Sequence, residues 1–262
     1  MVNTTDPVIV YPLGASFAYT TSKFFANVMV KVGDRRIFVD CPPYLPRMLE
    51  ANAREGEEVV ELDDYREVII THMHTDHAGG LEELAYLNMF EPVMLPKVYG
   101  PVWLLEDIWT SLRPSIGRSY RGDGGLAEMN WYFEPVPIGN PHDFGDFILS
   151  TMLTRHIPDT IALKFDFGDV KVGFSSDTGF KPELIEWLSE CDMIMHDAWV
   201  GPLDAFGGNM EILHTPLADL MTLPREFQRK TFLHHYDDSV GTVDYDIGEY
   251  RFLEQGKVYK VR

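Results

Sequence analysis

Apolar and polar residues follow one another in short blocks along this chain. Apolar runs rich in β-branched residues recur between Gly, Pro and Asp, which is the pattern of buried strands. We expect the first third of the chain to be mostly strand, and a hairpin where Gly168 and Asp169 separate two such runs. The predicted strands cover residues 27–32, 36–39, 68–70, 146–154, 161–167, 170–175 and 193–195.

Helical spacing of apolar residues marks four other stretches, at residues 81–88, 102–121, 182–188 and 216–221. Pro182 and Pro216 stand where a helix begins. Strands followed by helices, twice over, predict an α/β protein with helices outside packed sheets. No repeat or low-complexity linker divides the sequence, so we expect one domain over residues 1–262, with a helical insertion at about 99–130.

The composition says more about the possible functions of the protein than about its fold. A hydrophobic content of 45% lets the chain bury a large core. The formal net charge of -19 repels a long polyanion, although not one small phosphate held by a metal. The sequence has no bilayer-length apolar run, and its start lacks signal-peptide regions, so we expect a soluble, cytoplasmic protein without a membrane partner. Cys41 and Cys191 are expected to be buried thiols.

The stretch ITHMHTDHAGG, residues 70–80, concentrates three of the nine histidines and a carboxylate. His72 and His74 are two apart, so in an extended segment their side chains leave on the same side and can meet one metal. Asp76 and His77 lie where the chain turns before the next helix, and a second ion would use them. The glycine pair that ends the motif supplies the conformational freedom for this turn. Imidazole and carboxylate ligands without thiolate suit zinc, with manganese or iron as alternatives.

A structural role has to be weighed against metal binding at this cluster. A lone histidine is usually a structural or solvated residue. Several imidazoles crowded together without a metal would leave polar groups unpaired, which costs stability. We therefore interpret the cluster as a metal site.

The same segment resembles a known signature. HMHTDH, residues 72–77, resembles the HxHxDH motif of the metallo-β-lactamase superfamily of metallohydrolases, and it follows a predicted strand and precedes a predicted helix. The resemblance covers most of the chain and implies a four-layer αββα sandwich of two mixed β-sheets flanked by helices. The ligands it implies are His72, His74 and His156 for a first ion, Asp76, His77 and His235 for a second, and Asp177 as a bridge between them.

Short stretches elsewhere carry the rest of this resemblance. They are TRHIPDTIALKF with His156, FSSDTG with Asp177, and FLHHYDD, in which His235 is favoured over His234 as the ligand. Asp40 in IFVDCP resembles the aspartate that orients the metal loop without binding metal. His156 and Asp177 also follow predicted strands, so strand ends can gather them at one rim of the sheets.

Two later segments resemble the ribonuclease Z branch, MIMHDAW with His196 and Asp197, and LHTPLADL with His214. This resemblance implies that Asp197 orients and charges His214, which donates a proton to the leaving oxygen or binds the phosphate. Asp stands where the branch has Glu, so the reach of Asp197 to His214 is in question. A purely structural role for His196 and His214 stays open, and His142 is expected to be a surface residue in a turn.

The predicted reaction follows from a dinuclear site. Two ions can hold a hydroxide between them and clamp both oxygens of an in-line displacement. The diiron branch has glutamate in place of the second histidine and true β-lactamases generally lack the bridging aspartate, so neither branch matches. We predict a phosphodiesterase that cleaves a small phosphodiester, such as a cyclic nucleotide, by metal-hydroxide attack, with Asp76, His214 and Asp197 as catalytic residues.

Several alternatives remain beside this prediction. They are an ester, lactone or thioester hydrolase, a tRNA 3′-processing endonuclease, and a non-catalytic metal-binding or assembly protein. The 22 basic residues against 41 acidic ones leave few contacts for a folded RNA, so a small phosphodiester substrate and no extended nucleic acid are expected. The resemblance also implies a homodimer. The aromatic residues that either stack a base or belong to the core are Trp103, Trp109, Tyr120 and Trp131.

Overall fold

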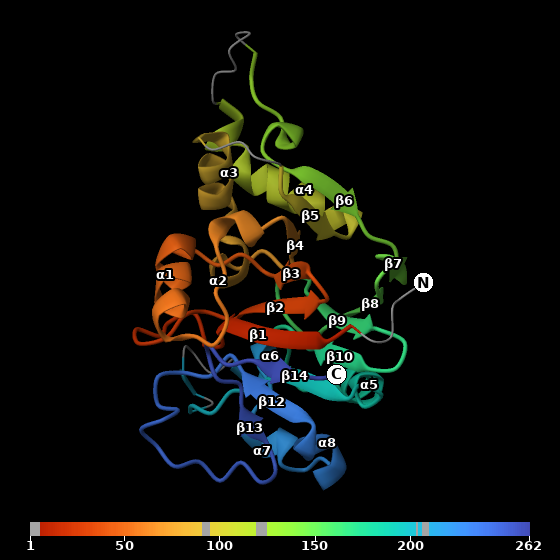
Figure 1. The fold of residues 1–262 in the computed structure, drawn as a ribbon. Coiled ribbons are helices and arrows are strands. Elements are labelled where there is room, and N and C mark those ends of the chain that lie inside the picture. The colour runs from red at the N-terminus through yellow and green to blue at the C-terminus, as the bar shows by residue number, and fades with distance from the viewer. Residues whose placement is uncertain (1–5, 91–94, 119–124, 203, 206–209) are drawn as a thin grey trace.

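Two β-sheets of seven strands each form the centre of the part of the chain that the computed structural model describes, residues 6–90, 95–118, 125–202, 204–205 and 210–262 (Figure 1). The first sheet contains, from edge to edge, β14 (Tyr259–Lys260), β1 (Val8–Gly14), β2 (Asn27–Val32), β3 (Arg35–Val39), β4 (Glu67–Ile69), β5 (Lys97–Gly100) and β6 (Glu134–Pro137). The second contains β13 (Arg251–Phe252), β12 (Thr231–His234), β11 (Met193–Asp197), β10 (Lys171–Phe174), β9 (Ile161–Asp166), β8 (Ile148–Leu153) and β7 (His142–Asp143).

Each sheet has an antiparallel half and a parallel half. In the first sheet β14, β1, β2 and β3 pair antiparallel, whereas β3, β4, β5 and β6 pair in parallel. In the second sheet β7 to β10 pair antiparallel and β10 to β13 in parallel. β9 and β10 form the hairpin predicted at Gly168, whose φ is 93°. The prediction of two mixed sheets is therefore confirmed, and each parallel half brings the carboxyl ends of several strands to one edge.

Alternate residues of the central strands face different hydrophobic clusters, so the centre of each sheet is buried on both faces. In β2, Val28 and Val30 join the cluster shared by the two sheets, while Met29 faces the helices outside the first sheet. In β11, Met195 joins the shared cluster and Ile194 faces the helices outside the second. Burial on both faces explains why these strands read as continuous apolar runs.

Helices complete four layers by packing on the outer faces of the sheets (Figure 1). Those packed outside the first sheet are α1 (Leu45–Glu55), α3 (Leu81–Phe90) and α4 (Val102–Leu112). Those outside the second are α5 (Pro182–Leu188), α7 (Leu217–Leu220) and α8 (Arg225–Arg229). The short turns are α2 (Thr75–Ala78), α6 (Met210–Leu213), η1 (Leu62–Asp64), η2 (Ile116–Arg118) and η3 (Met129–Trp131). Among the described residues, no helix is long and apolar enough to cross a membrane.

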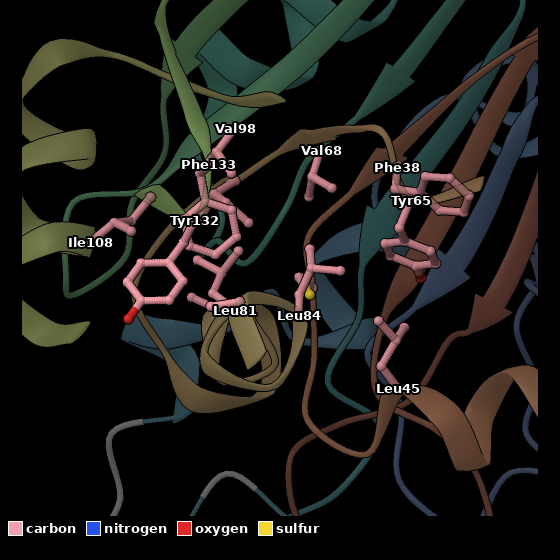
Figure 2. Packing of buried hydrophobic residues seen from close by; sticks show 14 of the residues in the cluster. Phe38, Leu45, Tyr65, Val68, Leu81, Leu84, Val98, Ile108, Tyr132 and Phe133 are labelled. Carbon is pink, nitrogen blue, oxygen red and sulfur yellow. The ribbon is translucent and has the colours of Figure 1, made fainter. Parts of the chain in front are cut away.

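Figure 2 shows how the helix after the histidine motif is anchored on the first sheet. Leu81 and Leu84 of α3 belong to the same buried cluster as Phe38 of β3. The Phe38 ring stacks on that of Tyr65, with centroids 3.8 Å apart, and the Tyr65 hydroxyl donates a 2.6 Å hydrogen bond to Oδ1 of Asn27. This packing holds the start of α3, and with it the segment that carries the motif.

Two predicted elements need correction. The first third of the chain is not mostly strand, because β1 to β4 together occupy 21 residues of it and α1 occupies another 11. The helix predicted over 102–121 ends at Leu112, since Pro114 lacks the N–H that would continue it. Most of the Gly-rich break after it lies outside the described residues. The expectation that Cys41 and Cys191 are buried thiols is confirmed.

Candidate metal and catalytic site

The carboxyl ends of the parallel strands gather the polar side chains of the site. In the first sheet Asp40 directly follows β3, and His72 lies three residues beyond β4. In the second sheet Asp177 follows β10, Asp197 is the last residue of β11, and His235 directly follows β12. All five side chains are buried. Ligands in α/β proteins bind at this end of the strands, and here two sheets contribute to one site.

The motif folds as an extended segment followed by one helical turn, as its sequence predicts. His74 precedes α2 with φ -62° and ψ 148°, and its Nδ1 lies 3.2 Å from Nε2 of His72. The two imidazoles therefore meet on one side of the chain. Asp76 and His77 lie within α2, where both are buried.

The glycines after the motif serve close packing rather than an unusual backbone conformation. Gly79 has φ -64° and ψ -19°, which any residue adopts, and Gly80 is not among the residues with positive φ. A Cβ on Gly80 would lie 2.2 Å from the carbonyl oxygen of Pro42. The Gly80 N–H donates to the carbonyl of Cys41 at 2.8 Å, and the Cys41 N–H donates to His77 at 2.6 Å. The motif is thus docked directly on the segment after Asp40.

One group of ligand-type atoms contains His72, His74, His156 and Asp177, each offering an atom within 4.8 Å of the others. His156 Nε2 lies 3.1 Å from His74 Nδ1 and 3.8 Å from Oδ2 of Asp177. His156 Nδ1 lies 2.8 Å from the carbonyl oxygen of Leu213, to which it donates, so Nε2 keeps its lone pair toward the group.

A second group contains Asp76, His77, Asp177 and His235, within the same limit of 4.8 Å. His235 Nε2 lies 3.3 Å from an oxygen of Asp76 and 3.3 Å from Oδ2 of Asp177. His77 Nε2 lies 3.3 Å from Oδ1 of Asp177. Asp177 therefore belongs to both groups and presents one oxygen to His77 and the other to His235.

Asp40 lies behind the second group. Its Oδ2 accepts a hydrogen bond from Nδ1 of His77 at 2.8 Å, and its Oδ1 accepts one from the backbone N–H of Thr71 at 2.8 Å. Donation from Nδ1 leaves Nε2 of His77 facing Asp177. This geometry agrees with the orienting role that the sequence resemblance implies.

The electrostatics of the site favour a cation. Burial alone would lower the pKa of His77, but the carboxylates of Asp177, Asp76 and Asp40 outweigh burial and hold that pKa well above its usual value. Burial lowers the pKa of His156 to about 4, so its imidazole is neutral and has a lone pair for a metal.

Four buried atoms of the site residues have no hydrogen-bond partner among the described residues: Nε2 of His77, Oδ1 of Asp177, Oδ1 of Asp197 and Nδ1 of His235. Such atoms would be costly if nothing met them. Imidazole nitrogens and carboxylate oxygens without thiolates suit divalent metals such as zinc, manganese or iron. The residues of both groups therefore fit divalent metal ions.

Asp197 reaches His214 despite its short side chain. Oδ2 of Asp197 lies 2.9 Å from Nδ1 of His214 and also accepts the backbone N–H of Thr178 at 2.8 Å. Burial alone would lower the pKa of His214, but the Asp197 carboxylate outweighs it and raises that pKa to about 9. His196 does not join this pair, because its Nδ1 donates to the backbone carbonyl of Asp197 at 2.8 Å and the ring is fully buried.

Two other histidines lie apart from the groups. His234 is the last residue of β12, and its ring stacks on Phe174 with centroids 4.7 Å apart, whereas His235 adopts φ 64° and turns toward Asp177. The structure thus brings His235 and not His234 to the site. His142 is not in a turn as expected, because it pairs with Leu149 in strand β7.

A cavity of about 550 Å³ opens onto both groups and the His214 side chain. Its walls are formed by Phe17, Ala18, Tyr19, Phe25, His74, Thr75, Asp76, Asp177, Met210, Leu213, His214 and His235. The aromatic residues Phe17, Tyr19 and Phe25 were missed in the sequence, where nothing marks the loop between β1 and β2.

The aromatic residues proposed from the sequence do not line this cavity in the described part of the chain. Trp103 and Trp109 are partly buried against the cluster outside the first sheet, and Trp131 is 40% exposed in η3. Tyr120 lies outside the described residues.

The architecture is shared with solved structures. The metallo-β-lactamase fold protein YhfI from Bacillus subtilis superposes with a TM-score of 0.72 at 16% identity, covering 97% of this chain and 100% of that chain. The short form of human tRNase Z gives a TM-score of 0.68 at 17% identity, covering 97% of this chain and 99% of that chain. The fold and the site together define the class of this protein, a metal-dependent hydrolase of the metallo-β-lactamase fold.

Sequence comparison defines the family within this class. The chain belongs to the family described as anti-Pycsar protein Apyc1, which matches residues 8–259. The anti-Pycsar protein Apyc1 of Paenibacillus sp. (strain J14) is 30% identical over 254 residues, covering 94% of this chain and 96% of that relative.

Proposed function

We propose that this protein is a phosphodiesterase that hydrolyses a small phosphodiester, such as a 3′,5′-cyclic nucleotide, with two divalent metal ions. The observation that carries this proposal is that Asp177 belongs to two groups of ligand-type atoms, all of them buried except the partly buried His74, beside the pair His214 and Asp197. One cavity exposes members of both groups together with His214. Zinc is the proposed metal, with manganese or iron as alternatives.

The residues have separate roles in this proposal. His72, His74 and His156 would hold the first ion, Asp76, His77 and His235 would hold the second, and Asp177, which belongs to both groups, would serve both. When bound, the ions supply a Lewis acid at the phosphoryl oxygen and lower the pKa of water. The packing of the ligands on strand ends keeps their geometry fixed when substrate enters.

His214 acts on the leaving group. Its Nδ1 donates to Asp197, so Nε2 is the nitrogen available to the substrate in the cavity. The Asp197 carboxylate keeps the imidazole protonated, and a protonated imidazole gives its proton to the oxygen that departs from phosphorus. The acid and four of the proposed metal ligands, His74, Asp76, Asp177 and His235, then line the same cavity.

The substrate is proposed to be small because of charge and size. A net charge of -19 disfavours a folded RNA. A cavity of about 550 Å³ is in the range that holds a small ligand. The sequence resemblance to the ribonuclease Z branch, which includes enzymes that hydrolyse cyclic nucleotides, some of them encoded by phages, supports this substrate class. A cytoplasmic homodimer is part of the same proposal.

A substrate panel tests the reaction. Purified protein is assayed with cyclic mononucleotides, bis-p-nitrophenyl phosphate, a lactone and a transfer RNA precursor. We expect turnover of the cyclic mononucleotides and of the p-nitrophenyl diester. Turnover of the lactone alone would support an ester or lactone hydrolase, and turnover of the RNA alone would overturn the electrostatic reasoning.

Metal content tests the ligand assignment independently of activity. We expect mass spectrometry to show that His72→Ala has lost one metal ion per chain. Asp177→Ala should bind both metal ions more weakly. The matched control is His142→Ala, on the edge strand β7, which should retain the metal of the wild type. A His72→Ala protein with full metal and full activity would remove this residue from the site.

A further inference from the structure

A second, smaller hollow of about 280 Å³ lies next to this cavity. The walls of the two hollows share Phe17 and Tyr19. The smaller one is completed by Trp199, Asp237, Asp238 and Ser239. A ligand whose phosphate lies at the metal groups therefore has an aromatic recess beside it.

A row of rings connects the site to this recess. Phe17 is buried, and its ring packs edge-on against His235 at 5.2 Å and against His214 at 5.7 Å between centroids. On its other sides it contacts Tyr19 and Trp199, each at 5.3 Å. Tyr19 is the most exposed ring of this row, with 72% of its surface accessible to solvent.

The loop that carries Tyr19 is fastened to the strand end that carries His235. The His235 N–H donates to Ala15 at 2.7 Å, and the Phe17 N–H donates to Tyr236 at 3.0 Å. Asp238 accepts hydrogen bonds from the backbone N–H and the hydroxyl of Thr21, at 2.7 and 3.0 Å. These bonds on both sides of Tyr19 fix its position relative to the metal groups.

We propose that Tyr19 is the platform on which the base of a nucleotide substrate stacks, and that it determines the affinity for substrates that carry a base. The inference rests on the proposed function. In a cyclic nucleotide one ribose separates the base from the phosphate, and here one ring, Phe17, separates Tyr19 from His214 and His235. Stacking suits this position because every base offers a flat face to an aromatic ring.

The experiment compares two substrates that differ only in the base. One is a 3′,5′-cyclic nucleotide, and the other is the methyl riboside 3′,5′-cyclic phosphate, which has no base. For Tyr19→Ala we expect KM for the cyclic nucleotide to rise by about 5- to 20-fold, the lower part of the range for base stacking. KM for the base-free ester should change much less, and kcat for both should stay close to wild type.

Two variants serve as controls. Tyr19→Phe keeps the ring and loses the hydroxyl, so it should restore the KM of the wild type. Trp131→Ala removes another exposed aromatic ring that does not line either hollow, and it should leave KM unchanged. An equal rise in KM for both substrates in Tyr19→Ala would refute the proposal that Tyr19 is the stacking platform. The same rise in KM in Trp131→Ala would refute it as well.

Binding separates this inference from the function on which it rests. Calorimetry with a cyclic nucleotide phosphorothioate that resists hydrolysis should give a Kd for Tyr19→Ala that is about 5- to 20-fold above that of the wild type. If the wild type cleaves cyclic nucleotides and Tyr19→Ala binds and cleaves them equally well, the platform alone is wrong. If the wild type neither binds nor cleaves them, both proposals are wrong.

Discussion

The pair of Asp197 and His214 allows the sharpest test of the proposed chemistry. Asp197→Asn keeps the shape of the side chain and removes its charge. An amide oxygen at the position of Oδ2 still accepts from Nδ1 of His214 and from the N–H of Thr178, which lie 2.9 and 2.8 Å away. The backbone N–H of Asp197, which donates to Ser175, is unaffected. The variant should therefore fold.

The magnitude follows from the hydrogen bonds. A hydrogen bond to a charged group contributes about 1.5–3 kcal/mol and a neutral one about 1 kcal/mol. Loss of the charge should thus cost the protonated His214 about 0.5–2 kcal/mol, so at alkaline pH, above the His214 pKa of about 9, the protonated fraction and with it kcat should fall roughly 2- to 30-fold. Asp197→Ala removes the partner of His214 altogether, so the rate should fall toward the full contribution of a general acid, about 10²–10⁴-fold.

The assay compares two leaving groups. A cyclic nucleotide releases a ribose oxygen, which needs a proton to depart, whereas bis-p-nitrophenyl phosphate releases a stable anion that needs none. We expect the loss of kcat/KM in Asp197→Asn to be large for the cyclic nucleotide and small for the p-nitrophenyl diester. The matched control is Asp219→Asn on α7, outside the cavity wall, which should match the wild type on both.

Equal losses on the two substrates would refute the reasoning, because they would mean that Asp197 supports the site as a whole and not the proton donor. Full activity of a folded Asp197→Ala protein would refute it as well. Metal content of each variant has to equal that of the wild type, so that the comparison reports on His214.

Two further predictions concern the architecture of the site. His235→Ala should lose metal, whereas His234→Ala should retain metal and only lower the Tm, since His234 packs on Phe174 away from the groups. Metal analysis of both proteins tests this prediction, and metal loss in His234→Ala alone would reverse the assignment of the ligand. Gly80→Ala should lower the free energy of unfolding by about 3 kcal/mol in a denaturant titration, because the added Cβ would lie 2.2 Å from the carbonyl oxygen of Pro42. An unchanged midpoint of the unfolding transition would contradict the close packing of the motif against Pro42.

The elements that the sequence predicts well are those with a local signal. The strands β2 and β10 are short and mostly buried, and the histidine motif lies between a strand and a helix, so local patterns suffice there. The helix α1 was missed because its buried stripe, Leu45, Met48, Leu49 and Asn52, includes a polar residue and follows two prolines. Strand β6 was missed because it contains Pro135 and Pro137, which an edge strand tolerates and a central strand does not.

The site divides in the same way. The resemblance of short motifs predicted all the residues of the two groups, and the structure places these residues close together. Phe17 and Tyr19 carry no such signal, because their place beside the site depends on the loop after β1 docking against Tyr236 near the other end of the chain. Contacts of this kind arise only when both sheets are assembled, so no window of the sequence contains them.

The division of the site between two sheets has a consequence for how the protein matures. Asp76 and His235 are 159 positions apart in the chain, and they meet only when the second sheet is in place. A nascent chain leaving the ribosome therefore presents half of a binding site, with its imidazoles and carboxylates open to water. An ion bound as proposed would therefore meet its full set of ligands only after the second sheet has assembled.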